Sequence, residues 1–223
     1  GRDPGVILRP DLMAGVPTLT GIAPRDGQQV MRLGGEVRLT GHALAGGEAR
    51  VRFTRPGSAE VLELAPLAPS TPHRVTFRLP GGAPLAPADP AAGSAADPGA
   101  WRIGTYTVEL VIRDEDGRES TSNALAIALA PRSTPAVAAD PGGVRLTMSA
   151  EPPIRPGQSV AILLGRQMQL LDSPASPVSE AEAVFAGLRP GAKLAARLRV
   201  DGIDSPVIDM ASDPPSLVTV TVP

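Results

Sequence analysis

The sequence of 223 residues contains no cysteine, so disulfide bonds, thiol chemistry and cysteine-based metal sites are all excluded. Whatever fold it adopts must therefore be held together by its core and its hydrogen bonds. Long apolar runs are missing as well, and no stretch approaches the roughly 18 residues that indicate a membrane-spanning helix. The sequence accordingly predicts no membrane span.

Aromatic residues are rare, and the chain contains only five: Phe53, Phe77, Trp101, Tyr106 and Phe185. So few aromatic rings make a poor stacking platform, which argues against single-stranded nucleic acid and against many sugar sites. The charge is nearly balanced, because 21 Lys and Arg residues face 23 Asp and Glu residues, giving a formal net charge of −2. Bulk electrostatics therefore offer no attraction for nucleic acid or for an anionic membrane.

Proline and glycine, by contrast, are abundant, with 26 and 24 residues respectively. They punctuate the chain every few residues, which favours short strands joined by turns and leaves little room for helices. The strongest strand pattern lies in residues 104–123, where large apolar residues occupy every second position: Tyr106, Val108, Leu110 and Ile112. We predict that this segment is the central strand of a β-sandwich, followed by a tight turn at Asp116-Gly117.

Similar alternation predicts strands along the rest of the chain. They are expected at 18–23, 36–44, 49–55, 60–64, 73–79, 124–130, 144–148, 158–164, 167–171, 193–201 and 217–222. Residues 179–188 are ambiguous. Ser179 with Glu182 matches the capping box of a short helix, whereas Val184, Ala186 and Leu188 suit a strand, which we favour because the neighbouring segments are strands.

These patterns predict an all-β fold of two immunoglobulin-like β-sandwich domains in tandem, residues 17–131 and 136–223. Residues 1–16 are expected to be an N-terminal arm or the end of a preceding domain. Residues 80–100, rich in Pro, Gly and Ala, are expected to be a mobile loop inserted in the first domain. The linker 131–135 contains two prolines, so we expect a restricted hinge.

No catalytic motif is present: the nucleophile elbow, the P-loop, the zinc-protease helix and the Rossmann glycine pattern are all missing. His42 and His73 are isolated in sequence, whereas zinc requires three or four converging ligands, so both are interpreted as loop residues that form hydrogen bonds. The sequence thus predicts a protein that is not an enzyme, with no catalytic residue, no cofactor and no metal site.

Two acidic stretches have a calcium site as their alternative interpretation. Residues 114–117 do not match the ligand spacing of an EF-hand loop, and Asp-Gly is typical of hairpin turns. Asp201, Asp204 and Asp209 alternate with glycine and proline, as turn-forming carboxylates do. We interpret both stretches as turns and keep a cation site as the weaker alternative for the second.

One surface pattern suggests a binding role. Five arginines are expected to point outward from strands of the first domain: Arg38, Arg50, Arg52, Arg74 and Arg78. If these strands share a sheet, the arginines form a basic stripe suited to an acidic protein partner. The alternative is that Glu36, Glu63 and Glu109 neutralise them across neighbouring strands.

The first domain resembles the immunoglobulin-like IPT/TIG module. The resemblance rests on PTLTGIAP at residues 17–24, VRLTGHAL at 37–44, GTYTVELVIRD at 104–114 and Ser122-Asn123. It implies a Pro-bounded first strand, and it places Tyr106 where Ig-like folds often have a tyrosine corner.

Residues 143–164 (GVRLTMSAEPPIRPGQSVAILL) and 196–209 (ARLRVDGIDSPVID) resemble the C-terminal, Ig-like part of the tube-cap (terminator) proteins of bacterial contractile injection systems, which are phage-tail-like. The resemblance implies a non-catalytic structural or docking module whose protein partners are tube, sheath or cap components, assembled in the cytoplasm. Two alternatives stay open. One is a secreted or surface module for adhesion or carbohydrate binding, with Trp101 as its candidate aromatic; the other is an accessory domain of a secreted enzyme.

Overall fold

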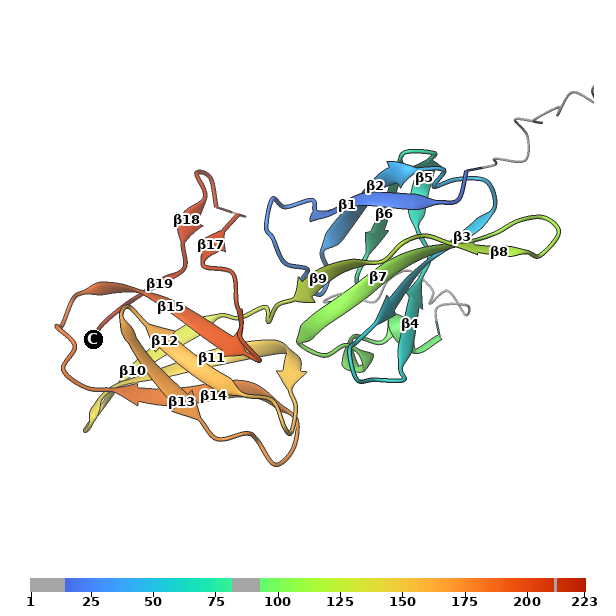
Figure 1. The fold of residues 1–223 in the computed structure, drawn as a ribbon. Coiled ribbons are helices and arrows are strands. Elements are labelled where there is room, and N and C mark those ends of the chain that lie inside the picture. The colour runs from blue at the N-terminus through green and yellow to red at the C-terminus, as the bar shows by residue number, and fades with distance from the viewer. Residues whose placement is uncertain (1–14, 82–92, 211) are drawn as a thin grey trace, which may run out of the picture.

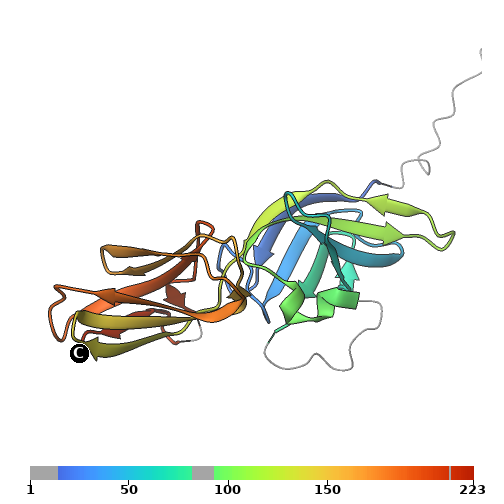
Figure 2. The same ribbon diagram turned by 90° about the horizontal axis from the view of Figure 1, so that it is seen from below.

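The computed structural model describes residues 15–81, 93–210 and 212–223. The chain is all-β and forms two immunoglobulin-like β-sandwiches in tandem, as predicted (Figure 1). Seen from below, the two modules lie end to end (Figure 2). In the described part of the chain, no helix has the length and apolarity needed to cross a membrane. The N-terminal arm predicted for residues 1–16 lies almost wholly outside the described residues.

The first module consists of two facing antiparallel sheets. One has the strand order β1-β2-β6-β5, built from β1 (Thr18–Pro24), β2 (Glu36–His42), β6 (Arg74–Arg78) and β5 (Leu67–Thr71). The other has the order β4-β3-β7-β8, with β9 also paired to β7, and consists of β4 (Val61–Leu64), β3 (Glu48–Thr54), β7 (Gly104–Arg113), β8 (Glu119–Thr121) and β9 (Leu125–Leu129).

Strand β7 is central, as its apolar alternation predicted. It pairs with β3, β8 and β9, and its inward residues are buried in the core. The rings of Phe53 and Trp101 meet edge to face there, with centroids 5.0 Å apart. The Tyr106 hydroxyl donates to the carbonyl oxygen of Arg102 at 3.0 Å and accepts from its N–H group, so it forms the tyrosine corner that the resemblance implied.

The second module also has two sheets. The first has the order β10-β11-β14, from β10 (Pro135–Asp140), β11 (Gly143–Ile154) and β14 (Val178–Phe185). The second has the order β13-β12-β15-β16, with β19 also paired to β15, from β13 (Gln167–Leu171), β12 (Val160–Leu164), β15 (Lys193–Val200), β16 (Ile203–Asp204) and β19 (Thr219–Thr221). A small hairpin, β17 (Ile208–Asp209) with β18 (Ser216–Leu217), stands apart from both sheets (Figure 1).

Each module contains its own group of buried apolar residues. The first group runs from Leu19 to Leu129, and the second from Leu146 to Val220 with the addition of Ile103. The predicted domain limits, 17–131 and 136–223, stay predictions.

Both modules use a buried serine to extend the hydrogen bonding of a long strand. In the first, Ser122 Oγ accepts from the N–H of Leu110 at 2.9 Å, and the Ser122 N–H donates to the Leu110 carbonyl. In the second, Ser205 has the same two bonds with Leu198 on β15, at 3.1 and 2.7 Å. In each module the serine side chain thus accepts a hydrogen bond from a strand N–H group that no neighbouring backbone carbonyl reaches, so this buried polar group stays paired.

The ambiguous segment, residues 179–188, contains most of strand β14, but the prediction of which of its residues face the core was wrong. Ala181, Ala183 and Phe185 point into the core, whereas Val184 points outward with 37% of its surface exposed. Strands β5, β10, β16 and β17 were not predicted. In β5 and β10, proline, alanine and polar residues hide the alternation on which such predictions depend.

The loop prediction for residues 80–100 is wrong for its second half. Two 3₁₀ turns, η2 (Gly93–Ala96) and η3 (Pro98–Ala100), lead into the sheet, and Ala95 is buried in the core. The indole N–H of Trp101 donates to the Ala95 carbonyl oxygen at 3.0 Å, and the Asp97 side chain caps η3 by accepting from the Gly99 N–H. Residues 82–92 lie outside the described part of the chain.

Candidate docking surface

The outward face of the β1-β2-β6-β5 sheet has an excess of positive charge. Its four strands contain three arginines, Arg38, Arg74 and Arg78, and a single carboxylate, Glu36. The register places Glu36 opposite Arg78, and Arg38 opposite Thr76, which lies between Arg74 and Arg78 on β6. Arg74 and Arg78 are four residues apart, so about 13 Å of strand separates them, with Arg38 beside the midpoint. We call these three arginines the basic sheet face.

The one carboxylate of this face is already occupied. Glu36 accepts from Arg78 and, at 2.8 Å, from Arg25, which follows β1. The hydrogen bond from Arg78, followed by that from Arg25, holds the pKa of Glu36 below its usual value. Among the described residues no carboxylate pairs with Arg38 or Arg74, and the buried Arg38 Nε has no hydrogen-bond partner. A charge that its own neighbours leave unpaired is available to an anionic partner.

The opposite sheet of the same module is neutralised. Its strands β3, β4, β7, β8 and β9 contain three arginines and four glutamates. Arg50 pairs with Glu48 at 2.7 Å and Arg52 with Glu63 at 2.8 Å. Arg113 pairs with Glu119 at 2.5 Å, which lowers the pKa of that carboxyl. Mixed charges of this kind form an ordinary solvated face.

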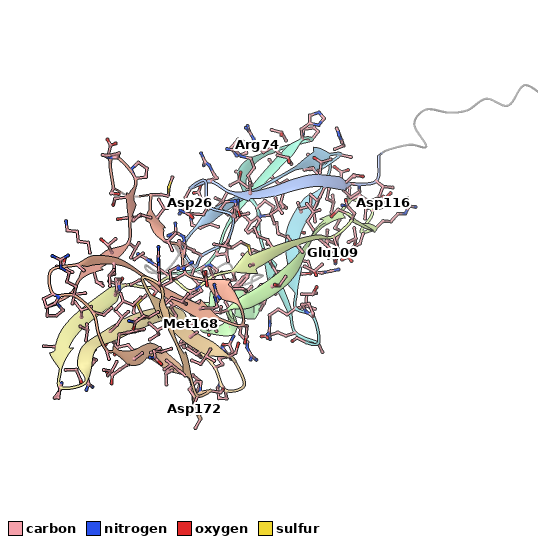
Figure 3. All side chains as sticks on the ribbon, turned by 60° about the vertical axis from the view of Figure 1, so that its left-hand side comes forward. Asp26, Arg74, Glu109, Asp116, Met168 and Asp172 are labelled. Atoms are coloured by element: carbon pink, nitrogen blue, oxygen red, sulfur yellow. The ribbon has the colours of Figure 1, made fainter. Side chains whose placement is uncertain are left out.

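The structure therefore divides the five predicted arginines between two sheets. Arg38, Arg74 and Arg78 share one outward face, whereas Arg50 and Arg52 lie on the other sheet, so the five do not form one stripe. Arg74 and Glu109 extend from different sheets of the module (Figure 3). The sequence indicated which residues point outward, but sheet membership depends on strand pairing, which alternation does not encode. Docking by these residues stays a prediction.

The junction between the modules contains a buried amide, Gln158, which is only 1% exposed. Its Nε2 donates to the Ile103 carbonyl at 3.0 Å and to Asp201 Oδ2 at 2.7 Å, while its Oε1 accepts from the Arg155 N–H at 2.9 Å. One side chain thus joins the start of β7 to two loops of the second module. Ile103 itself packs into the second core, although it precedes β7 of the first.

Two further contacts join the modules at other places. The Gln28 side chain, in the loop after β1, donates to the Ile208 carbonyl of the β17–β18 hairpin at 3.3 Å. The Met210 methyl group lies beside Gly27, 3.8 Å from where a Cβ would stand. The linker is also held, because Arg132 and Glu151 exchange backbone hydrogen bonds. These contacts lie on two sides of the linker, and the restricted hinge stays a prediction.

The other chemical candidates have structural roles. His73 Nδ1 lies 3.1 Å from the Gly41 carbonyl, and its ring meets that of His42 edge to face at 5.6 Å. Asp201 accepts from Gln158 and from the Ser159 N–H, and Asp204 pairs with Arg199 at 2.5 Å. Asp114 accepts from the Arg118 N–H within the hairpin turn. In the described part of the chain, no three His, Asp or Glu side chains gather as a metal site would require.

All five aromatic residues are buried. Trp101, the candidate for carbohydrate contact, lies in the first core together with Phe53, Phe77 and Tyr106, while Phe185 lies in the second. Burial also raises the pKa of Tyr106. Stacking against a sugar ring requires an exposed aromatic face, which none of these residues offers.

Comparisons with known proteins give a family match for the second module. Residues 126–221 match the family described as a domain of unknown function, DUF8756. A search of the curated proteins finds no match.

A search of the solved structures returns distant similarities, and the three described next share 16% identity or less with this chain. The fibronectin(III)-like modules of CbhA from Clostridium thermocellum share 13% identity with this chain, over 91% of it and 94% of theirs, with a TM-score of 0.23. The interferon gamma receptor alpha chain of chicken shares 8%, over 93% and 99%, with a TM-score of 0.40. A Bacteroides ovatus protein, SGBP-B, solved in complex with a mixed-linkage heptasaccharide, shares 16%, over 87% and 43%, with a TM-score of 0.27.

Proposed function

We propose that this chain is a non-catalytic docking module, which binds an acidic protein through the basic sheet face and holds it at a fixed place relative to the second module. The observation that carries the proposal is the contrast between the two sheets of the first module. Arg38 and Arg74 have no carboxylate partner in the described part of the chain, whereas the arginines of the opposite sheet pair with glutamates. Complementary charge speeds encounter with an anionic surface and selects against cationic ones.

The contacts at the junction support the second half of the proposal. Gln158 and the β17–β18 hairpin join the modules on two sides of the linker. A partner held on the first module is therefore also placed with respect to the second. This arrangement suits a structural component better than a flexible tether, because little conformational entropy remains to be lost when an assembly forms.

The parent assembly that we propose is a contractile injection system, with this chain as an Ig-like pair of a cap-associated protein. Its support is the resemblance of PPIRPGQ, residues 152–158, and RLRVDGIDSP, residues 197–206, to that family. The acidic partner would then be a tube, sheath or cap component. A carbohydrate-binding role, the alternative, lacks an aromatic platform because Trp101 and the other aromatic residues are buried.

Cosedimentation tests the proposal with phage-tail-like particles purified from the bacterium that makes this protein. The chain is mixed with the particles, and the bound fraction is measured against concentration and salt. We expect binding that weakens as salt rises, because exposed charges are screened. The Arg38→Glu/Arg74→Glu variant should lose at least tenfold in affinity, whereas Arg118→Glu/Arg189→Glu, with the same change in net charge, should bind like the wild type.

Two results would count against the proposal, and they are distinguishable. Equal binding by both double variants would show that the basic sheet face is not the docking site. No binding of the wild-type chain to the particles would remove the injection-system assignment. The melting temperature of each variant is measured to detect misfolding. The Arg38→Gln/Arg74→Gln variant, which removes the two positive charges without reversing them, provides a milder version of the same test.

A further inference from the structure

The second module has an outward sheet face that differs from the others in the described chain, because it is apolar at one edge. Met168 and Leu170 on β13 expose 51% and 76% of their surface, and Met168 is labelled on the second module in Figure 3. They are two residues apart on one strand, so both side chains point to the same side of the sheet. Large aliphatic groups in water are costly, and clusters of them mark contact sites.

The strand register continues each of these residues into a row across the sheet. Met168 pairs with Leu163 on β12, and Leu163 pairs with Arg197 on β15. Leu170 pairs with Ala161, and Ala161 pairs with Arg199. Each row therefore begins with an exposed aliphatic side chain and ends in an arginine two strands away, about 10 Å across the sheet. We call these two rows the aliphatic–arginine face.

The two arginines are held in place by one carboxylate. Asp204 accepts from Arg197 at 3.1 Å and from Arg199 at 2.5 and 3.0 Å. Two guanidinium groups thus share a single negative charge, and the face stays positive. Because their positions are already fixed, a partner carboxylate would bind them with less loss of side-chain entropy.

The other sheet of this module shows what an ordinary solvated face looks like. On β11 and β14 the outward residues include Arg145 and Glu182, which pair at 2.9 Å, and Arg145 also pairs with Asp140 at 2.5 Å. There the one arginine is paired with two carboxylates, so this face has no excess of positive charge, and Val184 is a single exposed aliphatic residue. The aliphatic–arginine face has neither property.

We propose that the aliphatic–arginine face is a second docking site, which binds a segment of a partner protein. That segment has clustered aliphatic side chains, which cover Met168, Leu163 and Leu170, and a carboxylate about 10 Å further on, which meets Arg197 and Arg199. Met and Arg are enriched at protein interfaces, where an apolar centre contributes affinity and charge fixes the register. The site is separate from the basic sheet face and does not depend on it.

A random library of 16-residue peptides, displayed on phage and selected on the whole chain, tests this inference. The Met168→Ser/Leu170→Ser variant serves for counter-selection, so peptides that bind elsewhere, including at the basic sheet face, are removed. We expect the surviving peptides to combine several aliphatic residues with Asp or Glu. Synthetic versions should bind the variant at least tenfold more weakly than the wild type.

Matched variants separate the two halves of the site. Arg199→Gln should weaken the selected peptides about threefold to tenfold, while Arg199→Lys should retain part of the lost affinity. Val184→Ser, on the other sheet, should change nothing. Selection of no peptide that distinguishes wild type from the serine variant, or of peptides without acidic residues, would overturn the proposal. So would self-association through this face in analytical ultracentrifugation, because the occupant would then be a second copy. None of these results bears on cosedimentation through Arg38 and Arg74.

Discussion

Replacing Gln158 by leucine removes the three side-chain hydrogen bonds that this residue forms at the junction, while nearly preserving the volume of the side chain. The Ile103 carbonyl then loses its donor inside the protein, and a buried acceptor without a partner costs about 1–3 kcal/mol. The Arg155 N–H loses its acceptor too, but it is partly exposed and water replaces the bond at a cost of about 0.5–1 kcal/mol. Asp201 keeps its bond from the Ser159 N–H, so its loss is small.

The expected total is a loss of about 1.5–4 kcal/mol in the free energy of unfolding, measured by urea denaturation with circular dichroism. Gln167→Leu is the matched control, because Gln167 donates to the Ala186 carbonyl at an exposed position. Its effect should stay within about 0.5 kcal/mol. If Gln158→Leu costs no more than this control, the buried amide does not hold the junction together, and the reasoning fails.

Three further predictions concern single positions. Ser205→Ala leaves the Leu198 N–H unpaired in the core and should cost about 1–3 kcal/mol in a denaturation experiment; a neutral result would show that water reaches this site. Ala95→Asp buries a carboxylate beside Trp101 and should lower the melting temperature and shift the tryptophan fluorescence to the red, whereas a wild-type spectrum would show that this turn is not packed. The pKa of Glu36 is lowered in the folded protein, so its ion pairs stabilise the fold at pH values above the ordinary carboxyl pKa of about 4.3. This stabilisation is lost as the pH falls through the lowered pKa of the folded protein. The stability difference between wild type and Glu36→Gln should therefore be larger at pH 7 than at pH 3, and a difference independent of pH would contradict the ion pairs.

The architecture was predictable wherever one strand face is apolar and the other polar. Tyr106, Val108, Leu110 and Ile112 alternate without a break, so β7 and its central place could be read from the sequence. In β14 the buried face is made of Ala181, Ala183 and Phe185, and two small side chains are a weak apolar signal beside the larger Val184. The strand was therefore predicted, but with the wrong residues inside.

The candidate surfaces were predictable only in part, because they depend on which strands become neighbours. Arg38 and Arg50 have the same outward pattern in sequence, but they lie on different sheets. The rows that join Met168 to Arg197 cross three strands and leave no pattern along the chain. Gln158 gave no signal either, since a glutamine after a Pro-Gly turn is ordinary until the fold places the Ile103 carbonyl beside it.

Both proposed docking faces would be placed relative to each other only if the two modules form one rigid unit. Because the chain has no cysteine, the variant Arg118→Cys/Arg166→Cys accepts spin labels at two positions only, one on each module. Pulsed electron–electron double resonance then measures the distribution of distances between the two spin labels. A rigid unit should give one narrow peak, which broadens when Gln158→Leu is added. A broad distribution in the wild-type background, as two modules on a flexible linker would produce, would contradict it.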